Sequence, residues 1–199
     1  MKIDIYNTDK KYNIIYADPP WSYRDKRKGH KISGGATNHY ETMNIDEIKN
    51  IPIQNIADDN CMLFMWVTFP NLQEGLDTIK AWGFKYKTLR IQLDKNQQKN
   101  GKPFFGIGYY TKSNCEICLI GVKGKPIKES NSVSSVVISQ REQHSKKPDE
   151  IRDKIVELCG DIPRIELFAR QAVDGWDCWG LEAPDIDDKN IINNFYEKL

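Results

Sequence analysis

The sequence lacks long hydrophobic runs, and it has no excess of charge of either sign. No apolar stretch approaches the roughly 20 residues that a membrane helix needs, and residues 1–6 do not form the apolar core of a signal peptide. We therefore expect a cytoplasmic protein without membrane contact. The 29 basic and 28 acidic residues leave a formal charge of +1, which excludes a general polycationic grip on nucleic acid but leaves room for local basic loops.

Histidine and cysteine are also scarce. The chain contains 3 histidines and 5 cysteines, and its one Cys-x-x-Cys motif, Cys115 to Cys118, has no second pair of ligands with which to form a zinc site. An odd number of cysteines without an export signal favours free thiols in a reducing compartment. We predict no metal site, and we interpret the motif as two thiols of a buried strand.

The residues that are present indicate one α/β domain over residues 1–199. Short β-like runs alternate with helical patterns, which predicts a largely parallel sheet with helices on both faces. The predicted strands are 12–17, 61–67, 84–92, 115–122, 133–139 and 164–168. Predicted helices follow Asn44, Pro70 and Pro148, and the last two end near Gly83 and Gly160.

Two long polar segments, residues 22–41 and 94–113, interrupt this alternation. Both contain glycines and basic residues, including Lys26 and Arg27 in the first segment. Loops of this length are usually functional or disordered, and an α/β sheet binds its ligands beyond the carboxyl ends of its strands. We predict that both segments are loops that contact nucleic acid, with ordinary solvated surface as the alternative.

A short motif, Asp18-Pro19-Pro20-Trp21, directly follows the predicted strand 12–17. The two prolines remove backbone donors, so the motif offers acceptors only. The exocyclic amine of adenine could donate one N–H to the Asp18 carboxylate and the other to the Pro19 carbonyl, while Trp21 stacks on the ring. This chemistry suits group transfer to nitrogen. The alternative is a Pro-Pro turn followed by a core tryptophan.

Further along the chain, five blocks carry a resemblance to a known family. The motif at residues 18–21 resembles the catalytic signature of adenine amino-methyltransferases, specifically of the MT-A family, named after the seventy-kDa subunit of mRNA adenosine methyltransferase, with its bacterial and phage relatives. The blocks after the motif are similar to that family in the same order. They are HYETM (39–43), FMWVTF (64–69), GYYTKSNCEICLIGVKGKP (108–126), HSKKPDEI (144–151) and RIELFARQAVDGWDCWG (164–180).

The resemblance implies a Rossmann-like methyltransferase fold with permuted motif order, S-adenosylmethionine as cofactor, and direct methyl transfer to nitrogen. It implies a role for each of several residues. The implied catalytic residues are Asp18, Pro19, Pro20 and Trp21. The implied substrate-binding residues are Tyr40 and Glu116, which Lys26 and Arg27 of the first loop supplement. The implied cofactor-binding residues are Asp18, Lys147, Phe168, Arg170, Asp4 and Ile5.

The resemblance further implies methylation of the 6-amino group of adenine in nucleic acid. DNA is favoured, because the bare catalytic domain is similar to the bacterial and phage members. The alternatives are an RNA adenosine methyltransferase and a non-catalytic subunit that binds nucleic acid, and pairing as a homodimer or with a second methyltransferase-like subunit is left open. Two departures stand out: Leu181 replaces the usual Asn of the family, and Gln92 lies near a usual Trp.

Overall fold

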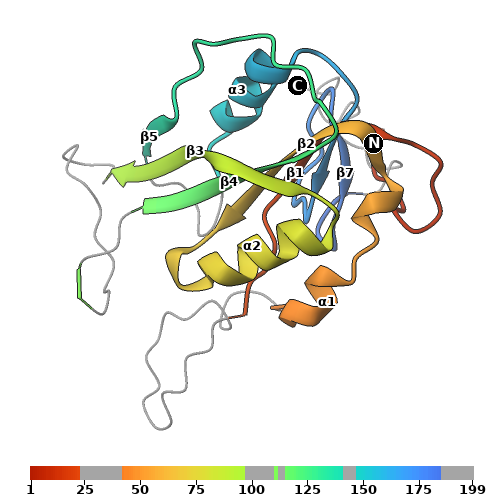
Figure 1. Cartoon of the computed structure of the whole chain (residues 1–199), viewed down its shortest axis with the longest axis horizontal. Helices are drawn as coiled ribbons and strands as arrows, with labels where there is room; N and C mark the ends of the chain where they lie inside the picture. The colour runs from red at the N-terminus through yellow and green to blue at the C-terminus, as the bar shows by residue number, and fades with distance from the viewer. Residues whose placement is uncertain (23–41, 97–109, 112–114, 141–146, 185–199) are drawn as a thin grey trace, which may run out of the picture.

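The fold is built on one mixed sheet in a computed structural model that describes residues 1–22, 42–96, 110–111, 115–140 and 147–184. The sheet order is β5-β3-β4-β2-β1-β6-β7. The strands are β1 (Tyr12–Ala17), β2 (Ala57–Val67), β3 (Lys85–Asn96), β4 (Cys115–Lys123), β5 (Val136–Gln140), β6 (Arg164–Leu167) and β7 (Asp177–Trp179). Figure 1 shows this arrangement.

Strand direction decides where the functional edge of the sheet lies. β1 pairs in parallel with β2 and β6, β6 with β7, and β3 with β5, whereas β4 is antiparallel to both β2 and β3. The carboxyl ends of six strands therefore meet at one edge, together with the start of β4. This arrangement confirms the predicted α/β, Rossmann-like fold class, and ligands bind at such an edge in open α/β sheets.

The helices form where the sequence predicts them. They are α1 (Ile45–Lys49), α2 (Leu72–Ala81) and α3 (Glu150–Cys159), with 3-10 turns at Ile53–Asn55 and Phe69–Asn71. The Asn44 side chain accepts a hydrogen bond from the Asp46 amide, and Glu47 accepts one from the Asn44 amide, which completes a capping box. Among the described residues, no helix has the length and apolar character needed to cross a bilayer.

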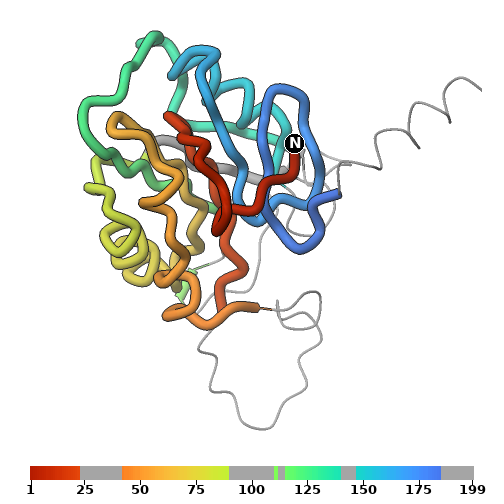
Figure 2. The backbone as a smooth tube through the Cα atoms, turned by 90° about the vertical axis from the view of Figure 1, so that its right-hand side faces the viewer, coloured from red at the N-terminus to blue at the C-terminus, as the bar shows by residue number. Residues whose placement is uncertain are grey.

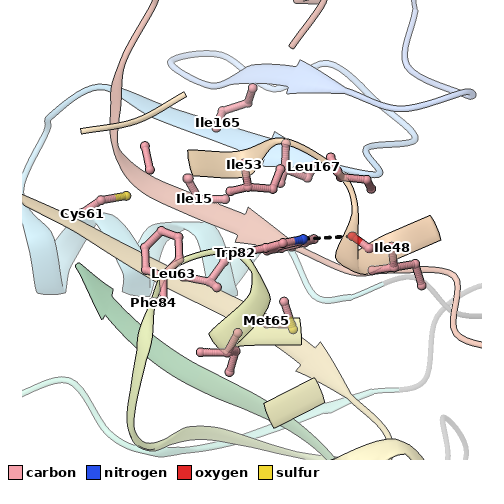
Figure 3. Close-up of a cluster of buried hydrophobic side chains, with 14 of the residues drawn as sticks. Ile15, Ile48, Ile53, Cys61, Leu63, Met65, Trp82, Phe84, Ile165 and Leu167 are labelled. Atoms are coloured by element: carbon pink, nitrogen blue, oxygen red, sulfur yellow. Dashed lines mark hydrogen bonds between the residues drawn. The ribbon is translucent and has the colours of Figure 1, made fainter. Parts of the chain in front are cut away.

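Alternation along the central strands divides the core between the two faces of the sheet. Ile15 and Leu63 point to the face covered by α1 and α2, whereas Tyr16 and Phe64 point to the face covered by α3. On the first face, the Trp82 indole N–H donates to the Ile48 carbonyl at 2.9 Å, which ties the end of α2 to α1. Figure 3 shows this contact within the first cluster of buried side chains.

The predicted elements differ from the observed ones mainly at β7, at the starts of β2 and β5, and at the end of β3. The three-residue strand β7 is missing from the prediction, and residues 1–3 extend the sheet beside it, with the Ile3 amide donating to the Cys178 carbonyl at 2.9 Å. Figure 2 shows the red N-terminal segment beside the blue segment that carries β7. β2 begins at Ala57 rather than Cys61, and residues 94–96, predicted to start a loop, belong to β3 because they pair with β5.

Candidate active site

A pocket of about 870 Å³ opens at the carboxyl ends of β1 and β6. It brings together six residues that the sequence analysis singled out from three distant segments, and these are Asp4, Asp18, Pro19, Pro20, Phe168 and Arg170. Sequence reasoning missed other lining residues, among them Tyr6, Trp179 and Glu182. Trp179 and Glu182 lie in or beside the conspicuous GWDCWG block, but without the fold nothing indicates that they face the pocket.

The motif after β1 forms a tight turn at the mouth of this pocket. The Trp21 amide donates to the Pro19 carbonyl at 2.8 Å, and the Met43 amide donates to the Pro20 carbonyl at 3.0 Å. The Pro19 and Pro20 carbonyls therefore each already accept one backbone N–H. A carbonyl oxygen has two lone pairs, so the Pro19 carbonyl keeps one acceptor site.

Trp21 lies in the core below the motif. Its side chain is 5% exposed, and its indole N–H donates to the Trp66 carbonyl at 2.8 Å. This is the position of a core tryptophan, the alternative that the sequence left open. Stacking of Trp21 on a target base stays a prediction.

A buried cation lies directly behind Asp18. The Lys147 ammonium is 2.8 Å from Asp18 Oδ2 and 3.2 Å from Glu116 Oε2, and it lies 5.2 Å from the centre of the Trp66 ring. Burial alone would lower the pKa of Lys147, but the Asp18 and Glu116 carboxylates outweigh burial and raise that pKa. Lys147 therefore stays charged at neutral pH.

This cluster joins three residues that are far apart in the sequence. Asp18 follows β1, Glu116 lies at the start of β4, and Lys147 lies just before α3. Because β4 runs antiparallel to β2, its first residues reach the same edge as the end of β1. The resemblance implies a cofactor-binding role for Lys147 and a substrate-binding role for Glu116, whereas the structure brings both side chains to Asp18.

The opposite wall of the pocket is aromatic and strained. Phe168 has a φ angle of 60°, in the left-handed region that non-glycine residues rarely adopt, and such a conformation costs on the order of 1–3 kcal/mol. Its ring lies 5.3 Å from that of Trp179, which in turn lies 6.3 Å from that of Tyr6. A Cβ atom added to Gly180 would lie 2.4 Å from the Ala169 carbonyl oxygen, so this turn requires glycine.

Charged groups and one exposed leucine complete the rim. Arg170 Nε lies 3.8 Å from Glu182 Oε2, a contact between two exposed side chains that contributes little energy. Asp4 accepts hydrogen bonds from the Asn7 side chain and from the Tyr6 amide, and these bonds lower the pKa of Asp4. Leu181 is 93% exposed.

Among the predicted site residues that the structure describes, four are absent from the lining of this pocket: Trp21, Glu116, Lys147 and Ile5. Ile5 is buried in the core, with 1% of its surface exposed. Tyr40, Lys26 and Arg27 lie outside the described residues.

The sequence is similar to known methyltransferases over most of its length. The MT-A70 family model matches residues 12–182. The chain is 35% identical over 192 residues to the Type II methyltransferase M.MunI of Mycoplasma sp. This match covers 88% of this chain and 79% of that protein. It is 29% identical over 193 residues to the N(6)-adenosine-methyltransferase catalytic subunit METTL3 of Homo sapiens, which spans 94% of this chain and 31% of that protein.

A plant relative gives a similar result. The chain is 27% identical over 177 residues to the N(6)-adenosine-methyltransferase MT-A70-like protein of Arabidopsis thaliana, across 88% of this chain and 24% of that protein. The chain thus spans most of the Mycoplasma relative and less than a third of the human and plant relatives.

Proposed function

The chain belongs to the MT-A70 family, and on that premise we propose that it transfers a methyl group to the exocyclic 6-amino group of adenine in nucleic acid. The predicted class of enzyme, an adenine amino-methyltransferase, is confirmed by the family match and by the names of its relatives. One observation carries the assignment of the site: the Asp18 carboxylate faces the pocket at the end of β1, and Lys147 holds one of its oxygens.

The proposed role of Asp18 is to hold and orient the target amine. Lys147 contacts Oδ2, and no hydrogen bond from the described residues occupies Oδ1, which would accept an N–H from the amine. The second lone pair of the Pro19 carbonyl would accept the other N–H. With both hydrogens held, the nitrogen lone pair points away from the acceptors towards the methyl donor, which is a positioning effect. After the methyl transfer the nitrogen carries a positive charge, which makes its N–H groups acidic. One of these protons then leaves the nitrogen for water.

The pocket fits S-adenosylmethionine as the proposed cofactor. Its aromatic wall of Tyr6, Phe168 and Trp179 suits a flat adenine ring, and the close turn at Gly180 leaves backbone groups at the surface of the pocket. Asp4 and Arg170 would bind the polar groups of the cofactor. When bound, S-adenosylmethionine supplies an electrophilic methyl group on a sulfonium.

DNA is the proposed substrate, with RNA as the second candidate. The higher identity to the Mycoplasma methyltransferase, and the far larger share of that protein's own length that the match covers, favour the bacterial type, for which the sequence resemblance implies DNA. The N(6)-adenosine-methyltransferases among the relatives favour RNA. The two predicted loops that would contact either nucleic acid lie mostly outside the described residues.

An assay with three substrate pools tests this proposal. Labelled methyl transfer from S-adenosylmethionine is measured in parallel for single-stranded DNA, duplex DNA and RNA, with the wild type, Asp18→Ala, and Asp161→Ala as a matched control. Asp161 is an exposed aspartate in the turn before β6, at the opposite edge of the sheet from the pocket. We expect label in DNA with the wild type and the control only.

Other outcomes would revise the proposal in defined ways. Label in RNA alone would replace DNA by RNA as the substrate. Equal label with Asp18→Ala would contradict the proposed role of Asp18. The absence of label from all three pools, with cofactor binding confirmed by calorimetry, would support the non-catalytic subunit instead.

A further inference from the structure

The face of the sheet under α3 contains two buried charged residues that the proposed reaction does not use. Arg152 is 7% exposed and Glu166 is 9% exposed. Apolar residues of the same face, including Ile151 and Ile155 of α3, pack in one cluster there, and Arg152 also borders a second cleft that Asp149 and Gln171 line. An ion pair at this position therefore needs an explanation.

Arg152 uses three nitrogens to join two elements. Its Nε donates to Glu166 Oε2 at 2.7 Å, its Nη2 donates to Glu166 Oε1 at 2.9 Å, and its Nη1 donates to Asp149 Oδ1 at 2.6 Å. Glu166 lies within β6, whereas Asp149 and Arg152 lie at the start of α3. The bidentate hydrogen bonding between Arg152 and Glu166 fixes both the distance and the orientation of the first turn of α3 relative to the sheet.

Stability alone does not account for this pair. Removing two charges from water costs several kcal/mol per ion, and replacing a buried ion pair by apolar residues of similar volume is often neutral or stabilising. The apolar cluster on this face, which includes Ile151 and Ile155, could accept such residues. What the ion pair supplies, and apolar packing does not, is one defined geometry for the first turn of the helix.

That first turn is directly connected to the cluster at Asp18. Lys147 lies two residues before Asp149, so the anchored turn sets where the Lys147 backbone runs. A second connection passes through aromatic rings. The Arg152 guanidinium lies 5.9 Å from the centre of the Tyr16 ring, and the Tyr16 hydroxyl accepts a 2.7 Å hydrogen bond from the indole N–H of Trp66, the ring beside Lys147.

We infer that Arg152 and Glu166 are positioning residues of the methyl-transfer site, which fix Lys147 and, through it, the Asp18 carboxylate. The inference rests on the proposed roles of Asp18 and Lys147. Neither positioning residue lines the main pocket. Their effect is therefore expected on kcat rather than on the KM for S-adenosylmethionine.

The conservative variant Arg152→Lys tests this role. It keeps the positive charge but loses the bidentate geometry. We expect kcat to fall about tenfold or more, since small misplacements of reacting groups are costly, while the KM for S-adenosylmethionine stays within about threefold. Circular dichroism at the assay temperature confirms that the variant is folded. A wild-type kcat in the folded variant would overturn the inference.

A double variant separates positioning from stability. Arg152→Met combined with Glu166→Leu replaces the ion pair by apolar side chains. We expect its melting temperature to equal or exceed that of the wild type, while its kcat stays at the low level of Arg152→Lys. If the double variant has both a wild-type melting temperature and a wild-type kcat, the inference is overturned, because the pair would then serve stability only. If the double variant fails to fold, Arg152→Lys decides.

Two controls belong to the same assay. Arg164→Lys changes another arginine that lies over a ring, that of Trp176 at 5.5 Å, and pairs with the exposed Asp161. It should leave kcat unchanged. Asp18→Ala separates the two proposals: if it retains activity, the proposed site is wrong, whereas an inactive Asp18→Ala beside a fully active Arg152→Lys would contradict the positioning role alone.

Discussion

The face of the sheet covered by α1 and α2 is packed mainly with apolar side chains, whereas the face covered by α3 also holds Arg152, Glu166 and the lysine that contacts Asp18. By the alternation of β1, Ile14, Tyr16 and Asp18 all belong to the α3 face. The comparison leads us to expect that the buried interior of the first face supplies stability, whereas the second face also carries a chain of polar contacts that ends at Asp18, the proposed acceptor of the target amine. Substitutions on the two faces should therefore affect different measurements.

The largest effect is expected for Lys147→Met on the α3 face. It removes the cation between two carboxylates and leaves Asp18 and Glu116 facing each other. We expect kcat to fall about a hundredfold and the protein to lose about 1–3 kcal/mol of unfolding free energy. Steady-state kinetics and urea unfolding measure the two changes.

Lys123→Met is the matched control for that variant. Lys123 lies at the other end of β4, partly buried, and its ammonium donates to the Ala57 carbonyl at 2.9 Å. This control should cost stability without changing kcat. If both lysine variants retain a kcat within twofold of the wild type, the α3 face has no special link to catalysis.

Leu63→Ala tests the apolar face at its centre. Leu63 of β2 is fully buried in the cluster on the α1 and α2 face, so truncation removes hydrocarbon contacts and leaves a cavity that costs about 2–5 kcal/mol. We expect a clear fall in melting temperature and an unchanged kcat at a temperature where the variant is still folded. A loss of kcat in the folded protein would contradict the division between the faces.

Arg152→Met should make the protein's free energy of unfolding depend more strongly on pH. Burial raises the pKa of the Glu166 carboxyl, and the bonds from Arg152 oppose that rise. A carboxyl whose pKa is higher in the folded protein than in the unfolded chain stabilises the fold at low pH, and this stabilisation is lost as the pH rises from the unfolded-state pKa to the folded-state pKa. Without Arg152 the folded-state pKa rises further.

The loss of stability in Arg152→Met, relative to the wild type, should therefore be larger at about pH 8 than at about pH 5. Thermal unfolding of both proteins across this range measures the difference. An equal loss at all pH values would mean that Glu166 does not become a stranded charge when Arg152 is removed.

The smallest effect is expected for Trp82→Phe on the apolar face. It removes the indole N–H that donates to the Ile48 carbonyl, which keeps a 3.3 Å hydrogen bond from the Ile51 amide, so the loss is that of one hydrogen bond, about 0.5–1.5 kcal/mol. We expect a lower melting temperature with wild-type kcat and KM. A change in kcat similar to that of the Arg152 variants would remove the contrast between the faces.

Much of the fold follows from local patterns in the sequence. Continuous apolar runs predict the central strands, and the Asn44 capping pattern and Gly83, with its φ of 82°, mark helix ends correctly. β7 is not predicted because it has only three residues. The start of β2 is not predicted because Asp58, Asp59 and Asn60 are polar. In both places tertiary pairing overrides the local pattern.

The site divides in a similar way. Asp18 and Phe168 are recognisable because each lies in a distinctive motif beside a strand end. Arg152 is not recognisable, since a charged residue in an amphipathic helix normally faces solvent, and only contact with Glu166 reveals that it is buried. Lys147 was assigned to the cofactor, and its contact with Asp18 depends on α3 returning to the end of β1.

The role of Asp18 in adenine methylation can be measured by nucleoside mass spectrometry of DNA incubated with S-adenosylmethionine and the purified wild-type, Asp18→Ala or Asp161→Ala protein. The account predicts N6-methyladenine with the wild type and with Asp161→Ala, and none with Asp18→Ala. Equal amounts of N6-methyladenine with Asp18→Ala, or methylation of a base other than adenine, would contradict it.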